Sequence, residues 1–324
     1  MRKSFATISA AALLLTGCAS PTQAELTGYA LLSDGLSASC EASGAGSAVD
    51  QVKVEGELGV EPEVTFPTPL EAQGIQSKEV IAGTGGKLIG NQKVAMHFSV
   101  YNAANGEKLQ ASEFGTENVV TQDLIANTNP DYCSALVGMS VGSRVAVLMG
   151  ADAAHNNQGI PSLGIGENDA LVFVFDVVDA YLPRANGESK AAEAGFPTVV
   201  LDPATGQPGI QILKTDAPTE FKRSVTIEGR GEEIQIGDVV VMHYAGWTWD
   251  GTQFDESWSS GSPASFEISS TGLIEGFVKA VEGAKVGSQI IAVIPPELGY
   301  GEAGSGAIGP NSTLIFVIDI LGKE

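Results

Sequence analysis

Four short blocks of sequence occur twice in this 324-residue chain, in the same order and about 145 residues apart. The clearest pair is Lys93-Val-Ala-Met-His-Phe98 and Asp238-Val-Val-Val-Met-His-Tyr244. The other three pairs begin at Asn105 and Asp250, at Leu136 and Val281, and at Ala170 and Thr313. A repeat this long indicates two tandem domains, because the units of a solenoid are only roughly 20–50 residues long.

The second copy has clear strand signals. Val239 to Gly246 is rich in β-branched and aromatic residues, and a period of two places Val240, Met242 and Tyr244 on one face. Asp250-Gly251 is typical of a tight hairpin turn. These features predict an antiparallel sheet.

One helix is predicted in this copy, because apolar residues recur at helical spacing from Leu273 to Val281 and stop before Gly283, a suitable C-cap. Residues 289–294 and 313–321 predict two further strands. A short helix laid across an antiparallel sheet is an α+β architecture, and the repeat predicts the same fold twice.

The charge of the chain excludes some partners. The formal net charge is −22, with a pI near 4.4. An acidic surface repels nucleic acid and anionic lipid headgroups alike, so membrane attachment has to be covalent or hydrophobic. The simpler interpretation is that the charge keeps an exported protein soluble.

The first residues are typical of an export signal. Met1-Arg2-Lys3 is basic, and the apolar run from Ile8 to Leu15 is too short to span a bilayer. Leu15-Thr16-Gly17-Cys18 resembles the lipobox of bacterial lipoproteins, which implies a signal peptide over residues 1–17 and acylation of the Cys18 thiol. The alternative is an ordinary signal peptide cleaved near Ala19 or Ala24.

Two cysteines remain if Cys18 carries lipid. In an oxidising compartment an exposed thiol is a liability, so Cys40 and Cys133 are predicted to form a disulfide. Two unpaired, buried cysteines are the alternative. Three scattered histidines and the absence of a CxxC motif predict no metal site and no cofactor.

Composition divides the chain further. Residues 18–50 are rich in Ser, Ala and Gly, which indicates a flexible, lipid-anchored tether. The first domain then covers residues 51–182, and a polar linker covers 183–195. The second domain covers residues 196–324. Two domains on one tether suit a monomer.

No motif for a nucleophile or a metal-assisted reaction is present. His243 lies on the strand face opposite Tyr244, where a lone histidine is more often structural than a general base. Prolyl isomerisation needs neither kind of group. Rotation about an amide faces a barrier of roughly 18–20 kcal/mol, and a dry, apolar pocket can lower it by disfavouring the planar, charge-separated amide.

The second copy resembles an FKBP-type peptidyl-prolyl cis–trans isomerase domain from about Gly237 to Leu321. Seven stretches in order carry the resemblance: His243-Tyr-Ala-Gly246, Asp250-Gly251, Phe254-Asp255, Leu273-Ile-Glu-Gly-Phe277, Lys285-Val-Gly287, Ile294-Pro-Pro-Glu-Leu-Gly-Tyr-Gly301 and Asn311-Ser-Thr-Leu-Ile-Phe316.

The resemblance implies a role for each cleft residue. The catalytic set is Tyr244, Asp255 and Tyr300, in which Asp255 orients Tyr244 and the Tyr300 hydroxyl faces the rotating amide. The residues expected to bind substrate are apolar, with the Ile274 backbone N–H holding a carbonyl: Phe254, Phe266, Leu273, Ile274, Phe277, Ile308 and Phe316. Phe277 replaces the family's usual Trp, and Ala264 replaces a second pocket Phe.

The alternative for these aromatic residues is ordinary core packing. Asp255 argues against it, since a carboxylate beside apolar side chains is costly unless it is paired. In the first copy the corresponding residues are Phe98, Leu109, Gln110 and His155. Without the phenol and the acid, that copy is expected to have little or no isomerase activity, and to bind extended chains or pack against its twin.

The expected function is therefore that of a lipid-anchored, extracytoplasmic folding catalyst. Its partners would be proline-containing unfolded or extended polypeptides, and the resemblance makes macrolide inhibitors candidate ligands. The competing hypothesis is a non-catalytic chaperone or peptide-binding lipoprotein whose pockets hold partners without turnover.

Overall fold

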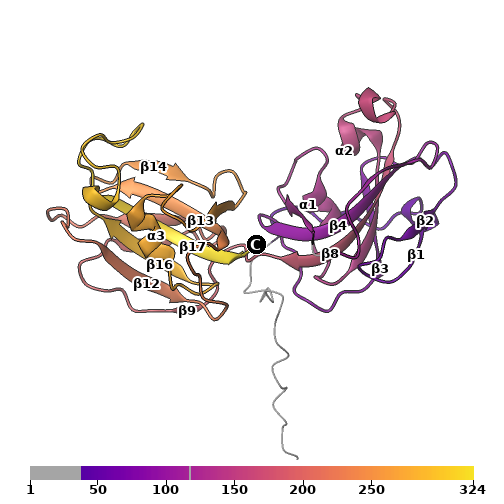
Figure 1. Ribbon diagram of the computed structural model, residues 1–324. Helices are drawn as coiled ribbons and strands as arrows, with labels where there is room; N and C mark the ends of the chain where they lie inside the picture. Colours follow the sequence, from indigo (N-terminus) through magenta and orange to yellow (C-terminus); the bar gives the residue numbers. More distant parts are fainter. Residues whose placement is uncertain (1–37, 117) are drawn as a thin grey trace, which may run out of the picture.

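The structure is a computed structural model that describes residues 38–116 and 118–324. These residues form two lobes, each built on its own antiparallel sheet (Figure 1). The predicted signal peptide, residues 1–17, and the predicted lipidation site, Cys18, lie outside the described residues. Within the described residues, no helix combines the length and the apolar composition needed to cross a bilayer.

The sheet of the first domain has six strands in the order β3-β7-β8-β4-β5, and β6 also pairs with β4. Their bounds are β3 Ile75–Ile81, β4 Lys93–Asn102, β5 Lys108–Ala111, β6 Val120–Asp123, β7 Arg144–Met149 and β8 Leu171–Ala180.

The sheet of the second domain repeats this arrangement, in the order β14-β13-β17-β16-β12-β9, with β15 paired to β13. Its strands are β9 Glu188–Ser189, β12 Lys222–Glu228, β13 Val239–Thr248, β14 Gln253–Glu256, β15 Ala264–Glu267, β16 Gln289–Ile294 and β17 Leu314–Lys323. Even an irregularity recurs, because the register shifts after Ala95 in β4 and after Val241 in β13. The prediction of two tandem α+β domains is confirmed.

The helices are short. The α-helices are α1 Tyr132–Leu136, α2 Ala151–His155 and α3 Glu275–Val281, and the 3-10 turns are η1 Val49–Gln51, η2 Pro161–Leu163 and η3 Pro296–Leu298. Helix α3 begins two residues later than predicted, because Ile274 has the extended backbone of an N-cap. It ends at Val281, with Glu282 as the C-cap residue, followed by Gly283 with a φ of +72°.

A two-stranded hairpin covers the outer face of each sheet. In the first domain it consists of β1 Lys53–Glu55 and β2 Glu63–Thr65, and in the second of β10 Thr198–Leu201 and β11 Pro208–Gln211. Each hairpin closes a second apolar cluster, so that both faces of each sheet are buried. The alternating pattern of a half-exposed sheet is therefore absent from the central strands.

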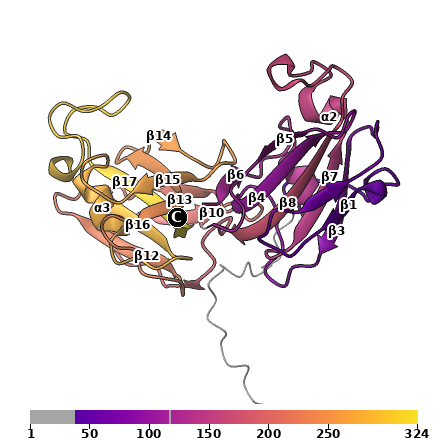
Figure 2. The same cartoon turned by 45° about the vertical axis from the view of Figure 1, so that its right-hand side comes forward.

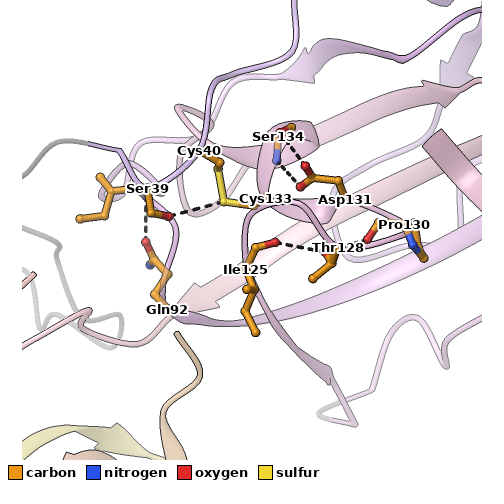
Figure 3. The surroundings of a disulfide bond; sticks show 10 residues. Ser39, Cys40, Gln92, Ile125, Thr128, Pro130, Asp131, Cys133 and Ser134 are labelled. Atoms are coloured by element: carbon orange, nitrogen blue, oxygen red, sulfur yellow. Dashed lines mark hydrogen bonds between the residues drawn. A yellow bond between two sulfur atoms is a disulfide. The ribbon is translucent and has the colours of Figure 1, made fainter. Parts of the chain in front are cut away.

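The arm that precedes the first domain is packed against it. Figure 3 shows the disulfide that joins Cys40 to Cys133 of α1. The Ser39 N–H donates to the Ile89 carbonyl, and Val49 is fully buried. The described part of the expected tether, residues 38–50, is thus part of the domain. The prediction of a flexible tether rested on composition, which does not reveal long-range contacts.

The connection between the domains is also buried. Tyr181 and Leu182 belong to the core of the second domain, and the Leu182 N–H donates to the Leu321 carbonyl at 3.1 Å. The Ala185 N–H donates to the buried Asp319 carboxylate at 2.8 Å. The expected linker, 183–195, is therefore anchored at its start and contributes strand β9.

Candidate active site

An aromatic cluster lies on the inner face of the second sheet, beside α3. Phe277 is its centre, since its ring meets those of Phe316, Phe266 and Tyr244 edge-on, with centroids 5.2, 6.3 and 6.3 Å away. Phe254 packs edge-on against Phe316 at 5.6 Å. Edge-to-face contacts of this kind hold rings in fixed orientations. The structure thus brings all five predicted rings together.

One polar pair stands at the edge of this cluster. The Tyr244 hydroxyl donates to Asp255 Oδ2 at 2.7 Å. Burial, and then the hydrogen bond to Asp255, raises the pKa of Tyr244, so the phenol stays protonated. Asp255 itself is exposed, which removes the expected argument from the cost of a buried carboxylate. What distinguishes the pair is the short hydrogen bond between the two side chains.

The strand that carries Tyr244 is held from behind by a serine. Ser257 Oγ accepts from the Tyr244 N–H at 3.0 Å and lies 2.8 Å from Nδ1 of His243. The His243 ring stacks on Trp258, and burial lowers its pKa to about 4. A neutral, enclosed imidazole fits the structural role expected for His243.

Gly246 allows the aromatic walls to approach the strand. A Cβ atom at this position would lie 2.6 Å from Phe254 and 2.9 Å from Phe316, closer than packing permits. Only glycine is therefore compatible with both rings in these positions.

The start of α3 provides a hydrogen-bond donor. Ile274 is the N-cap residue, and no acceptor for its N–H occurs among the described residues. Free N–H groups are normal at the first turn of a helix and are available to a ligand. Leu273 and Ile274 also pack against the aromatic cluster.

Two residues come from the segment between β16 and β17. Ile308 is buried in the core cluster of the second domain. Tyr300 is 37% exposed, yet lies near enough to Tyr244 to raise its pKa slightly. The structure thus joins Tyr244 to Asp255, while Tyr300 stands partly exposed on the segment between β16 and β17.

The first domain has a counterpart of this aromatic cluster. Tyr132 lies four residues before Leu136, as Phe277 lies four before Val281, and its ring meets Phe173 and Phe175 edge-on at 5.9 and 5.7 Å. Phe175 faces Phe98 across the strands, where the second domain pairs the smaller Ile318 with Tyr244.

One polar side chain of the first domain, at the position that matches Tyr300, forms its hydrogen bonds within its own loop. His155, the match for Tyr300, accepts from the Gly159 N–H at Nδ1 and donates from Nε2 to the Asp169 carbonyl. This imidazole therefore stabilises its own loop.

The sequence interpretation missed two supporting residues, Ser257 and Tyr132, and it gave Gly246 no role beyond its place in a motif. Ser112 and Ser257 occupy corresponding positions, since each accepts from the backbone N–H of the strand residue after the histidine. This conserved spacing within the repeat was visible in the sequence and could have revealed Ser257.

Comparison with known proteins places the second domain in a family. The sequence model of the FKBP-type peptidyl-prolyl cis-trans isomerase family matches residues 231–321. The chain is 44% identical over 109 residues to the FKBP-type peptidyl-prolyl cis-trans isomerase FkpA of Escherichia coli (strain K12), a match that covers 34% of this chain and 39% of FkpA. A crystal structure of FkpA from Escherichia coli aligns with 39% identity and a TM-score of 0.31, covering 34% of this chain and 51% of that one.

A second relative is matched along nearly its full length. The chain is 36% identical over 118 residues to the FK506-binding protein of Streptomyces anulatus, which covers 36% of this chain and 95% of that protein. On this evidence, the chain belongs to the FKBP-type peptidyl-prolyl cis–trans isomerase family.

Proposed function

We propose that the second domain catalyses cis–trans isomerisation of X-Pro bonds in extended polypeptides. The observation that carries this proposal is the Tyr244–Asp255 hydrogen bond at the edge of an aromatic cluster with a free N–H beside it. The family match covers the same residues.

The chemistry follows from the properties of the amide. A planar X-Pro amide has partial double-bond character and a polarised carbonyl, and it exchanges between isomers in tens to hundreds of seconds. The twisted amide has lost this resonance, so an apolar surface penalises it less than the planar form. A site that binds the twisted form better lowers the barrier.

Each part of the cleft has a role in this proposal. The proline ring packs on Phe277, between walls that include Phe266 and Phe316. The Ile274 N–H holds a substrate carbonyl, and the Tyr300 hydroxyl donates to the rotating amide. Asp255 fixes the orientation of the Tyr244 hydroxyl. No nucleophile or metal is required.

The setting of this activity is proposed from the sequence. We propose that residues 1–17 direct export, that Cys18 carries a lipid anchor, and that the clients are exported chains. The Cys40–Cys133 disulfide supports an oxidising compartment. Macrolides are proposed as ligands of the same site, and the first domain, which residues 38–50 extend at its start, is proposed to be inactive.

The decisive experiment follows cis-to-trans exchange of a short X-Pro peptide. Tyr300→Phe and Asp255→Val should each lower kcat/KM by roughly 3- to 10-fold, the range expected for one lost hydrogen bond. Asp216→Val, which removes an exposed acid from a loop of the same domain, is the matched control. Equal rates for all four proteins would instead indicate a binding module without turnover.

A separate experiment tests the anchor. Cys18→Ala should release the protein from the membrane fraction into the soluble extracytoplasmic fraction. Unchanged retention would show that Cys18 is not acylated.

A further inference from the structure

The loop between β14 and β15, residues 257–263, touches the first domain (Figure 2). Ser262 donates from Oγ to Asp123 Oδ2 at 2.6 Å. The other carboxylate oxygen of Asp123 lies 3.6 Å from the Lys93 ammonium group. Asp123 ends strand β6, so this contact joins the sheet of one domain to a loop of the other.

Close packing at the preceding residue, Gly261, supports this contact between the domains. Gly261 has a φ of +68°, and a Cβ atom there would lie 3.2 Å from Asn91 Oδ1 and 3.7 Å from Ile125 Cγ2. Asn91 and Ile125 belong to the first domain. The backbone of Gly261 thus packs against side chains of the first domain, independently of the hydrogen bond at Ser262.

The same loop is tied to the cleft at both of its ends. At its start, Ser257 holds the backbone of Tyr244, and Ser260 Oγ donates to the Ser257 carbonyl at 2.8 Å. At its end, the chain enters β15, where Phe266 pairs with Val240 and forms part of the aromatic cluster. A displacement of the loop would therefore move Phe266 or Tyr244.

The segment that connects the two domains contacts both of them. Gln92 donates from its side chain to the Tyr181 carbonyl at 3.3 Å, and Tyr181 and Leu182 are buried in the second domain. Asp123 pairs with Lys93, next to Gln92, in the strand register. Asp123 therefore lies beside the residues of the first domain that bind the connecting segment.

We propose that Asp123 is a positioning residue for the cleft of the second domain, acting through Ser262 on the loop of residues 257–263. On this view the first domain serves as a brace for the wall of its twin. The inference rests on the proposed isomerase function for its kinetic readout. Its structural readout is independent of that function.

Two variants remove the contact from opposite sides, in the full chain. Asp123→Ala and Ser262→Ala should each raise KM for an X-Pro peptide roughly 5-fold, with a smaller change in kcat, because a displaced wall weakens binding in the ground state as well as the transition state. The double variant should be no worse than either single variant, as expected for two halves of one interaction. Asp123→Asn keeps an acceptor for Ser262 and should behave like the wild type.

Hydrogen exchange provides the second readout. Asp123→Ala should accelerate exchange of the backbone amides of residues 257–263, whereas Glu79→Ala should not. Glu79 is an exposed acid on β3, at the opposite edge of the first sheet, so it controls for the lost charge.

The outcomes separate the two proposals. Unchanged exchange in residues 257–263 of Asp123→Ala overturns the bracing role, whatever the turnover. A lower apparent kcat at constant KM also overturns it, because that result reports a smaller folded fraction. Absence of turnover in the wild type refutes the proposed function alone, and the exchange comparison then decides the bracing role.

Discussion

The aromatic clusters of the two domains differ, although each of the six strands of the first sheet has a counterpart in the second. In the second domain, Gly246 makes room for Phe254 and Phe316, and Tyr244 forms a hydrogen bond with Asp255. In the first, Val100 stands at the position of Gly246, and Leu109 replaces Phe254. The comparison teaches that the fold tolerates a change of the cluster, which depends on a few side-chain sizes.

The outer faces of the two sheets also differ, in the polar pair that each of them buries. In the first domain, Arg144 Nε donates to Asp176 at 2.6 Å, and the guanidinium also donates to the Gly56 and Val60 carbonyls. In the second, the corresponding pair is Gln289 and Asp319, joined at 2.7 Å. One domain therefore buries an ion pair, and the other buries an acid beside an amide.

The largest effect is expected from removing the disulfide. Replacing both Cys40 and Cys133 with Ser should lower the free energy of unfolding of the first domain by about 4 kcal/mol, because the bond joins residues 93 positions apart. All three tryptophans, Trp247, Trp249 and Trp258, lie in the second domain, so Trp fluorescence follows that domain alone. Calorimetry should show the unfolding transition of the first domain moving to lower temperature. The unfolding transition of the second domain, followed by Trp fluorescence, should stay where it is. A shared shift would mean that the domains unfold as one unit.

Arg144→Gln gives the first domain the residue of the second. The free energy of unfolding should fall by about 3 kcal/mol, because Asp176 stays buried without its cation and two carbonyls lose their donor. Chemical denaturation followed by far-UV circular dichroism measures the change. Lys78→Gln, at a partly exposed position of the edge strand β3, is the control and should change the free energy of unfolding very little. Comparable losses in the two variants would show that the burial of Arg144 is unimportant.

Gly246→Val transfers the first domain's residue into the aromatic cluster of the second domain. The new side chain would displace Phe254 and Phe316, and kcat/KM for an X-Pro peptide should fall roughly 100-fold. Gly209→Val adds the same side chain in β11, where the nearest atom is 3.8 Å away, and should leave kcat/KM unchanged. Retained activity in Gly246→Val would mean that Val100 does not explain the inactivity proposed for the first domain.

The smallest effect concerns pH. Burial raises the pKa of Asp319 to about 6, although the Ala185 N–H and Gln289 oppose this shift. The folded state therefore binds this proton more tightly than the unfolded state, so the contribution of Asp319 to stability is greatest below pH 4 and is lost as the pH rises through 6. The loss should be on the order of 2 kcal/mol.

The Asp319→Asn variant lacks the carboxyl group that titrates at this position. Its free energy of unfolding, followed by Trp fluorescence, should lack the decline between pH 4 and pH 6 that the wild type shows. Parallel pH profiles for the two proteins would show that Asp319 does not titrate in this range.

Much of the cleft was predictable from local sequence. The repeat at Lys93 and Asp238 revealed two domains, and the alternation of Val240, Met242 and Tyr244 placed the phenol on the inner face. The exposure of Asp255 was not predictable, because it depends on which side chains surround the end of β14. The extent of α3 was predicted only to within two residues, since the dihedral angles of Ile274 decide it.

The sequence by itself determined the duplication, the strand pattern and the chemical identity of the cleft residues, because period, turn residues and side-chain type are local properties. Tertiary structure alone decided that Tyr132 packs against Phe175, that the arm around Cys40 packs on its domain, and that Asp123 meets Ser262. These contacts join residues far apart in the chain. Their formation depends on how two folded surfaces fit together, and no short stretch of sequence encodes that fit.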